Sequence, residues 1–240
     1  MADLPEGDFS LRSSSRPAPE ASRPRVERIG HRGAPREFPE NTLPAFDRAL
    51  ALGADAIELD VHVSSDGVVI VHHDPDVQGR AIRTTPWRAL SRVELARGIF
   101  ISSLKEVLDL VGSRATVYVE LKGEAVEKPA IEAIRASSSR CAVHSFDHDV
   151  VARSAHLAPS LQRGILFDAY PRDVIGSMRA ASAVDVWPQW KLVDEQLVER
   201  VHAAGGRVIA WTVNTTTTAL GLVRLGVDGL CGDDVRLLTT

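Results

Sequence analysis

Acidic side chains interrupt two apolar stretches of the sequence in which an ordinary buried strand would carry none. The stretch AIELDV (56–61) contains Glu58 and Asp60, and TVYVEL (116–121) contains Glu120. Residues two apart in a strand share one face, so Glu58 and Asp60 point the same way. Clustered carboxylate oxygens without cysteine favour a hard cation, so these three acids are a candidate site for Mg²⁺ or Ca²⁺.

A predicted hairpin brings a histidine to the same place. Asp66-Gly67 stands between two alternating apolar runs, which is a strong hairpin signal, so 68–73 should fold back antiparallel on the preceding strand. A two-residue turn would place His73 opposite Asp60, on the same face. Histidine titrates near neutrality and suits proton transfer. The sequence therefore predicts that His73 lies beside the acidic pair.

The acids also have an interpretation that needs no metal. Two carboxylates about 4 Å apart repel by roughly 4 kcal/mol at an effective dielectric of ~20. A protonated member, a bound cation or a salt-bridge cluster with Arg32 and Lys122 would each relieve this repulsion. Lys122 shares a strand face with Glu120, and Arg32 follows His31 at the end of an earlier apolar stretch. Spacing alone leaves these alternatives open.

The elements that must position these residues are short apolar strands alternating with amphipathic helices. Helix starts are predicted at Asn41 or Thr42, at the capping box beginning with Ser103, and at Asp194. This alternation predicts an α/β fold, a parallel (β/α)₈ TIM barrel. An open doubly wound sheet is the rival, weakened because no glycine-rich nucleotide loop follows the first strand. The eight strand candidates are 26–31, 56–61, 116–121, 141–146, 163–167, 183–187, 207–213 and 227–231.

Two segments fall outside this alternation. Residues 1–25 hold four prolines, five serines and few large apolar side chains, so we expect a disordered N-terminal tail before a barrel domain spanning 26–240. Residues 75–102 are rich in arginine but poor in large apolar groups. We expect a short cap there, reduced to one or two helical turns beginning near Pro86 and placed beside the catalytic end of the barrel.

Composition restricts the partners and the compartment. A net charge of −4 offers no large positive field for nucleic acid. No apolar run approaches the ~18 residues of a membrane span, and the first residues lack a signal-peptide pattern. Cys141 and Cys231 are too few for a disulfide scaffold or a zinc cluster, so we expect free thiols in the cytoplasm. The oligomeric state cannot be read from the sequence.

The stretch from His31 to Pro75 resembles the opening signature of the glycerophosphodiester phosphodiesterase family. The matching motifs are His31-Arg32-Gly33, Pro39-Glu40-Asn41-Thr42, Gly53-Ala54-Asp55, Glu58-Leu59-Asp60, Asp66-Gly67 and His73-Asp74. The similarity continues through ISSLKEVLDLV, Val119-Glu120-Leu121-Lys122, Ser145-Phe146, Trp211-Thr212-Val213-Asn214 and Gly226-Val227-Asp228-Gly229. It therefore covers nearly everything after residue 25.

The resemblance implies a TIM-barrel hydrolase that cleaves glycerophosphodiesters, lipid-derived compounds, to glycerol 3-phosphate and an alcohol with a divalent metal. Carried over by position, Glu58, Asp60 and Glu120 correspond to metal ligands, and His31 and His73 to an acid–base pair. By the same carry-over, Arg32 and Lys122 correspond to phosphate contacts, and Trp211 to an aromatic side chain beside the substrate, with a core tryptophan as its alternative. Which histidine is the base, and whether the nucleophile is water or a substrate hydroxyl that forms a cyclic phosphate, stay open.

Two departures and two rival functions accompany the resemblance. Family members commonly end with Thr-Asp-x-Pro after the last strand, where this chain keeps only the acid, Asp233, and the cap segment is shorter than usual. The same machinery could act on a lysophospholipid or sphingolipid head group. A catalytically silent scaffold is the other alternative, disfavoured because the histidines and acids are intact.

The remaining histidines and aromatic residues carry weaker signals. His62 shares a strand face with Asp60 and could lie above the metal, but we expect it at a solvated hairpin position. We expect His72 in a structural role, while His144 has no motif around it. An apolar wall for an alcohol group is one interpretation of Phe38, Trp187 and Trp190, and packing is the one we expect.

Overall fold

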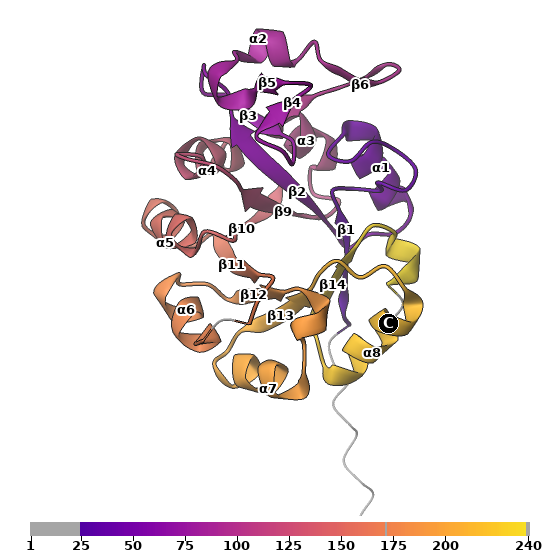
Figure 1. Cartoon of the computed structure of the whole chain (residues 1–240), viewed down its shortest axis with the longest axis vertical. Coiled ribbons are helices and arrows are strands. Elements are labelled where there is room, and N and C mark those ends of the chain that lie inside the picture. The colour runs from indigo at the N-terminus through magenta and orange to yellow at the C-terminus, as the bar shows by residue number, and fades with distance from the viewer. Residues whose placement is uncertain (1–24, 171, 239–240) are drawn as a thin grey trace, which may run out of the picture.

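The computed structural model describes residues 25–170 and 172–238, so the predicted tail lies outside the described residues except for Arg25. Eight parallel strands form a closed sheet in the order β1-β14-β13-β12-β11-β10-β9-β2, and pairing of β2 with β1 closes it. These strands are β1 (Glu27–His31), β2 (Ala56–Val63), β9 (Thr116–Leu121), β10 (Arg140–Ser145), β11 (Gln162–Phe167), β12 (Asp185–Pro188), β13 (Arg207–Ala210) and β14 (Gly229–Gly232). The predicted TIM barrel is confirmed (Figure 1).

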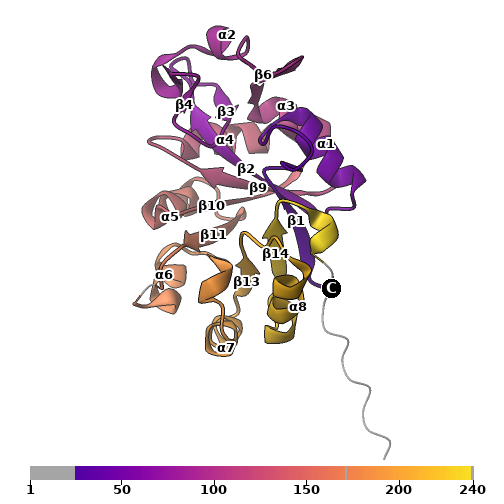
Figure 2. The same cartoon turned by 45° about the vertical axis from the view of Figure 1, so that its right-hand side comes forward.

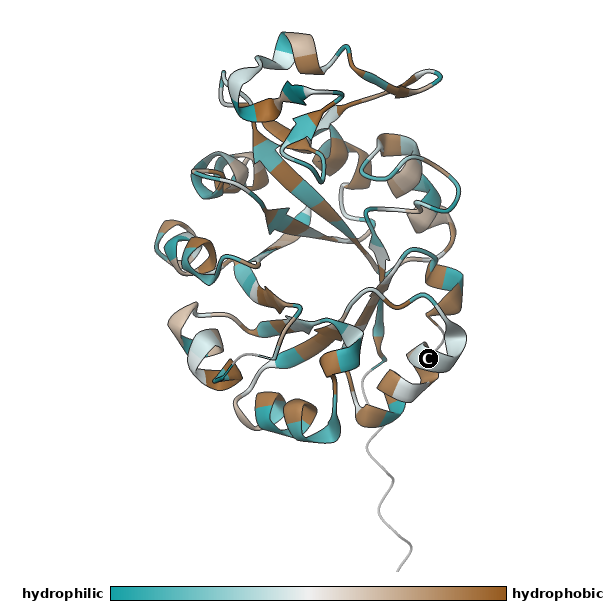
Figure 3. Ribbon diagram, viewed as in Figure 1, coloured by the Kyte–Doolittle hydropathy of each residue, from teal (hydrophilic) through white to brown (hydrophobic). Residues whose placement is uncertain are grey.

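Helices surround the barrel in the connections between strands (Figure 1). They are α1 (Leu43–Ala51), α3 (Leu104–Val111), α4 (Glu127–Arg135), α5 (His148–Leu157), α6 (Val174–Ala180), α7 (Glu195–Ala203) and α8 (Thr216–Leu225). Their ribbons carry both apolar and polar residues, as expected for helices with one face on the sheet (Figure 3). Three predicted starts are confirmed: Thr42 caps α1, Ser103 and Glu106 form the capping box of α3, and Asp194 caps α7.

The barrel interior has an apolar middle layer above a polar floor. The interior cluster comprises Ile29, Ala56, Tyr118, Ala142, Leu166, Trp187, Ile209 and Cys231, with Trp211 packed against it. Below it, Arg207 contacts Glu27 at 2.6 Å and Asp185 at 3.5 Å, and Tyr118 donates a hydrogen bond to Glu27. This floor closes the amino-terminal end of the barrel, which leaves the carboxyl end for a site.

The predicted hairpin exists, but its register differs by one residue. Strand β3 (Val69–Val71) runs antiparallel to β2 and pairs Val61 with Val71, while the amide of His72 donates to the carbonyl of Asp60. The turn therefore has a three-residue loop, in which Gly67 takes a positive φ of 84°. His72, rather than His73, lies opposite Asp60, and the predicted pairing of Asp60 with His73 is wrong.

The cap segment extends outward from the end of β2 and β3 (Figure 2). It contains β4 (Asp76–Val77), β5 (Arg80–Ala81), η1 (Ile82–Thr84), α2 (Trp87–Leu90), β6 (Glu94–Ala96) and β7 (Ile99–Phe100), and it returns through β8 (Ser102–Ser103), which pairs with β3. The helical turn predicted near Pro86 is α2, with Pro86 as its N-cap. The two small hairpins formed by β4–β5 and β6–β7 are additional to the predicted turn.

The remaining short helices are η2 (Trp190–Leu192) and η3 (Val235–Leu237). Among the described residues, no helix is both long and apolar enough to span a bilayer. Both cysteines are free thiols.

Candidate active site

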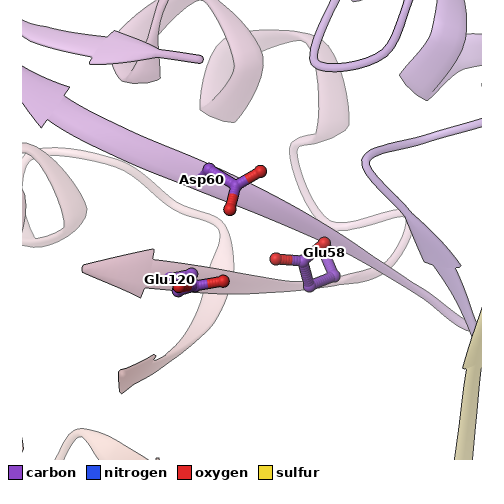
Figure 4. Close-up of side chains that lie close together, drawn as sticks. All are labelled: Glu58, Asp60 and Glu120. Atoms are coloured by element: carbon purple, nitrogen blue, oxygen red, sulfur yellow. The ribbon is translucent and has the colours of Figure 1, made fainter. Parts of the chain in front are cut away.

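Three buried carboxylates meet at the carboxyl ends of β2 and β9. Parallel pairing places Asp60 beside Glu120, and Glu58 lies two residues earlier on the same face of β2. One oxygen from each of the three lies within 4.8 Å of the others (Figure 4). The predicted grouping of Glu58, Asp60 and Glu120 is therefore present, and it is supplied by two strands rather than by mobile loops.

Two basic side chains partly neutralise this cluster. The Nε of Arg32 lies 3.1 Å from Oδ2 of Asp60, and the Nζ of Lys122 lies 3.3 Å from Asp60 and 3.2 Å from Glu120. The salt-bridge alternative is thus realised for two of the acids. Glu58 instead accepts a hydrogen bond from the backbone N–H of Arg32, and no lysine or arginine side chain of the described residues forms an ion pair with it. One carboxylate remains in excess.

The pKa values of Asp60 and Glu120 reflect this excess of carboxylates over basic side chains. Burial opposes ionisation of Asp60, but Arg32 and Lys122 outweigh it and lower the pKa of Asp60 to about 2. Burial and the neighbouring Asp60 charge raise the pKa of Glu120 to about 8. Such a site gains from a further positive charge, and its all-oxygen ligand set fits a hard divalent cation.

His31 ends β1 and is held by an aspartate. Its Nδ1 lies 2.7 Å from Oδ1 of Asp233, whose other oxygen accepts a hydrogen bond from Asn214 at 2.6 Å. Burial alone would lower the pKa of His31, but the hydrogen bond to Asp233 and the charge of Glu58 raise it above its ordinary value. With Nδ1 engaged, Nε2 is the nitrogen available for proton transfer.

His73 reaches the site although its predicted register is wrong. Strand β3 ends at Val71, and the chain beyond leaves the ladder, so the His73 ring lines the cavity with His31 and Glu58. Its Nδ1 lies 2.8 Å from Asp74, an arrangement like that of His31 and Asp233. Both predicted histidines therefore present the same ring nitrogen, Nε2, as the free one.

His62 is buried, so its predicted solvated position is wrong. Its Nε2 lies 3.1 Å from the carbonyl oxygen of His73, and a side chain at position 123 in place of glycine would crowd its Nδ1. Burial lowers the pKa of His62, which favours the neutral ring. His62 thus supports the backbone of the neighbouring His73 instead of lying in solvent.

A cavity of about 160 Å³ joins these residues at the carboxyl end of the barrel. It is lined by His31, Arg32, Glu58, His73, Glu120, Lys122, His144, Phe146, Leu166, Trp187, Trp211 and Cys231. Seven of the eight predicted site residues line this cavity. The eighth, Asp60, is fully buried beside Glu120 and has no exposed surface. The ring of Trp211 meets Phe146 edge-on at 5.4 Å, so one wall is aromatic.

Several polar residues of the site were not predicted from the sequence. Asn41 donates a hydrogen bond to Asp60 at 2.8 Å, and Asp233 with Asn214 orients His31. The sequence offered one signal for Asp233: it is the acid that this chain keeps from the Thr-Asp-x-Pro motif after the last strand. His144 lines the cavity and is buried, but no motif indicated it.

The cap lies near this end of the barrel without lining the cavity. Arg83 forms an ion pair with Glu124 at 3.1 Å, and Glu124 follows the carboxyl end of β9. A second groove lies beside the cavity, bordered by Glu120, Lys122, Glu124, Phe146, Asp147 and Arg153 among others. None of the described residues 75–102 lines the cavity or this groove.

Comparison with known proteins agrees with the fold and the site. The model of the glycerophosphoryl diester phosphodiesterase family matches residues 31–237. A glycerophosphodiester phosphodiesterase of Caldanaerobacter subterraneus subsp. tengcongensis is 30% identical over 230 residues, 88% of this chain and 95% of the relative. One from Bacillus altitudinis is 32% identical over 236 residues, covering 85% of this chain and 93% of the relative.

Solved structures share the barrel. An Oleispira antarctica phosphodiesterase, determined in complex with the product sn-glycerol-3-phosphate, superposes with a TM-score of 0.83 at 24% identity, covering 88% of this chain and 94% of that one. A Thermotoga maritima glycerophosphodiester phosphodiesterase gives a TM-score of 0.77 at 26% identity, covering 89% and 97%.

Fold and site together define a TIM-barrel hydrolase of phosphoric diesters. The chain belongs to the glycerophosphoryl diester phosphodiesterase family, and its activity is that of a glycerophosphodiester phosphodiesterase.

Proposed function

We propose that the enzyme hydrolyses glycerophosphodiesters to sn-glycerol 3-phosphate and an alcohol with a divalent cation, Mg²⁺ or Ca²⁺, held by Glu58, Asp60 and Glu120. The observation that carries the proposal is the buried acidic triad, two members of which, Glu58 and Glu120, line one cavity together with two aspartate-held histidines. The glycerol 3-phosphate product in the Oleispira antarctica structure supports a substrate of this size and charge.

The bound cation would neutralise negative charge on the phosphoryl oxygens as the bond to phosphorus forms. The chain's own residues manage the protons. One of His31 and His73 takes the proton of the attacking water or substrate hydroxyl at Nε2, and the other donates a proton to the leaving alcohol oxygen. Asp233 and Asp74 fix which ring nitrogen does this, because each engages Nδ1.

Arg32 and Lys122 fill a second role beside the acids. Their head groups border the cavity and carry fixed positive charge, so they bind the phosphate of the substrate while remaining paired to Asp60. Trp211 and Phe146 offer an apolar wall for the carbon skeleton of the substrate. A cytoplasmic location, expected from the two free cysteines, is part of the same proposal.

The test is turnover of glycerophosphocholine with and without chelator, with a lysophospholipid assayed beside it. We expect release of glycerol 3-phosphate that stops with chelator and returns with Mg²⁺ or Ca²⁺. Faster turnover of the lysophospholipid would favour the alternative head-group specificity. Metal-independent turnover would contradict the role given to the acids, and absence of turnover on every diester would favour a silent scaffold.

Glu58→Gln is the matched variant, since it keeps the shape of the side chain and removes one charge. It should reduce cation affinity and turnover while the barrel stays folded. Wild-type turnover of Glu58→Gln at low metal concentration would exclude Glu58 as a ligand.

A further inference from the structure

His144 is a buried histidine that the proposed reaction leaves without a role. It lies on β10, where parallel pairing places it beside Glu120 of β9, and its side chain is 1% exposed. Neither ring nitrogen has a hydrogen-bond partner in the described structure. A buried polar group without a hydrogen-bond partner is destabilising, so a partner for this ring is expected in another state of the enzyme, such as the cation-bound one.

The aromatic surroundings of His144 fix the direction of its ring. Trp187 meets the ring edge-on with centroids 4.4 Å apart, and Tyr118 lies 6.3 Å away on another side. Within this apolar packing, Nε2 faces Oε1 of Glu58 at 3.7 Å, which is too long for a hydrogen bond. Nε2 therefore lies close to the carboxylate of a proposed metal ligand.

His144 does not itself belong to the candidate ligand set. The group of ligand atoms lying within 4.8 Å of one another comprises only Glu58, Asp60 and Glu120 among the described residues. Glu58 is also the acid whose side chain pairs with no lysine or arginine, and its second oxygen is held by the Arg32 amide. The oxygen facing His144 is thus the one that no hydrogen-bond donor of the described residues fixes.

We propose that His144 is a positioning residue for Glu58: with the cation bound, Nε2–H of His144 donates a hydrogen bond to Oε1 while the Arg32 amide holds Oε2. Partners of this kind orient ligating carboxylates and contribute substantially to metal affinity. This inference rests on the proposed function, because it assigns His144 a part in the same metal site. Its effect passes through Glu58 and needs no contact with the substrate.

The experiment measures cation affinity by isothermal titration calorimetry, independently of turnover. His144→Leu removes the donor and keeps an apolar filler, whereas His144→Gln retains an N–H that can reach Glu58. We expect His144→Leu to weaken Mg²⁺ or Ca²⁺ binding about 10- to 100-fold and His144→Gln to recover most of it. Should His144→Leu not fold, His144→Asn, whose shorter amide does not reach, replaces it.

His156→Leu is the matched control because it makes the same substitution at an exposed histidine of α5 that does not line the cavity. This variant should bind the cation as the wild type does. Wild-type affinity in His144→Leu would overturn the proposal, and so would unchanged affinity combined with a raised KM, which would make His144 a substrate contact. If the wild-type enzyme itself bound no cation, the metal site would fail first, and the role of His144 would fail with it.

Discussion

The hydrogen bond between His31 and Asp233 offers the sharpest test of the proposed acid–base pair. In Asp233→Asn the side chain keeps its shape and its contact with Asn214, but the charge beside His31 disappears. Burial alone lowers the pKa of His31, and Asp233 is the largest influence that raises it. The variant should therefore lower this pKa, and the limb of the kcat–pH profile due to His31 should move to lower pH.

The size of the effect follows from the environment of the pair. Both side chains are largely buried, and a hydrogen bond to a charged group contributes about 1.5–3 kcal/mol, so kcat at neutral pH should fall roughly 10- to 150-fold. Asp74→Asn is the matched comparison at His73. Asp74 is 67% exposed, and exposed ion pairs contribute about 1 kcal/mol or less, so a loss of at most about fivefold is expected.

Steady-state kinetics of both variants between pH 5 and 9, with saturating cation, provide the measurement. Equal losses in the two variants, or an Asp233→Asn profile that superposes on the wild type, would refute the reasoning. A shift to higher pH would refute it as well, because the sign of the Asp233 contribution would then be wrong.

Three further outcomes are expected. Chelator should lower the Tm of the wild-type enzyme and leave that of Glu120→Gln nearly unchanged, because a cation that binds only the folded state stabilises it; equal shifts in differential scanning calorimetry would contradict this. Burial raises the pKa of Asp185 from 3.8 to about 6, so its ionised form destabilises the fold above pH 6 and this cost vanishes as the pH falls toward 3.8. Asp185→Asn should consequently increase the free energy of unfolding at pH 7.5 by up to about 3 kcal/mol, and by much less below pH 3.8, as urea denaturation in chelator would show. Reversal of the cap charge in Arg83→Glu should lower kcat/KM modestly at low salt and not at high salt, an on-rate effect that stopped-flow or initial-rate measurements would detect.

The barrel and its acidic cluster were predictable because both depend on local periodicity. Acidic residues two apart in an apolar strand share a face, and parallel strands bring their carboxyl ends together, so Glu58, Asp60 and Glu120 required no knowledge of tertiary contacts. The strand expected over 207–213 is shorter and ends at Ala210, and Asn214 beyond it donates a hydrogen bond to Asp233. Periodicity does not predict such a side-chain contact between distant motifs.

The hairpin register was not predictable because contacts from the cap set it. The amide of Trp87 donates to Asp66, and the amide of Ser65 donates to the carbonyl of Thr85, so residues from the cap stabilise the three-residue loop. Asp66-Gly67 alone favours the shorter turn. The role proposed for His144 could not be predicted from the sequence either. It depends on the absence of a hydrogen-bond partner for the buried ring, which only the three-dimensional structure shows.

The carboxylates and the histidines occupy different parts of the strands. The three carboxylates lie inside β2 and β9, where ladders on both sides fix them, whereas His31 is the last residue of β1 and His73 lies beyond the end of β3. Each of these two histidines has one aspartate to fix its ring. Substitutions near the strand ends should therefore alter proton transfer, and with it kcat and its pH dependence, before they alter cation affinity. In the proposed mechanism the sheet would determine where the cation binds, and the residues at and just beyond the strand ends would determine how protons move.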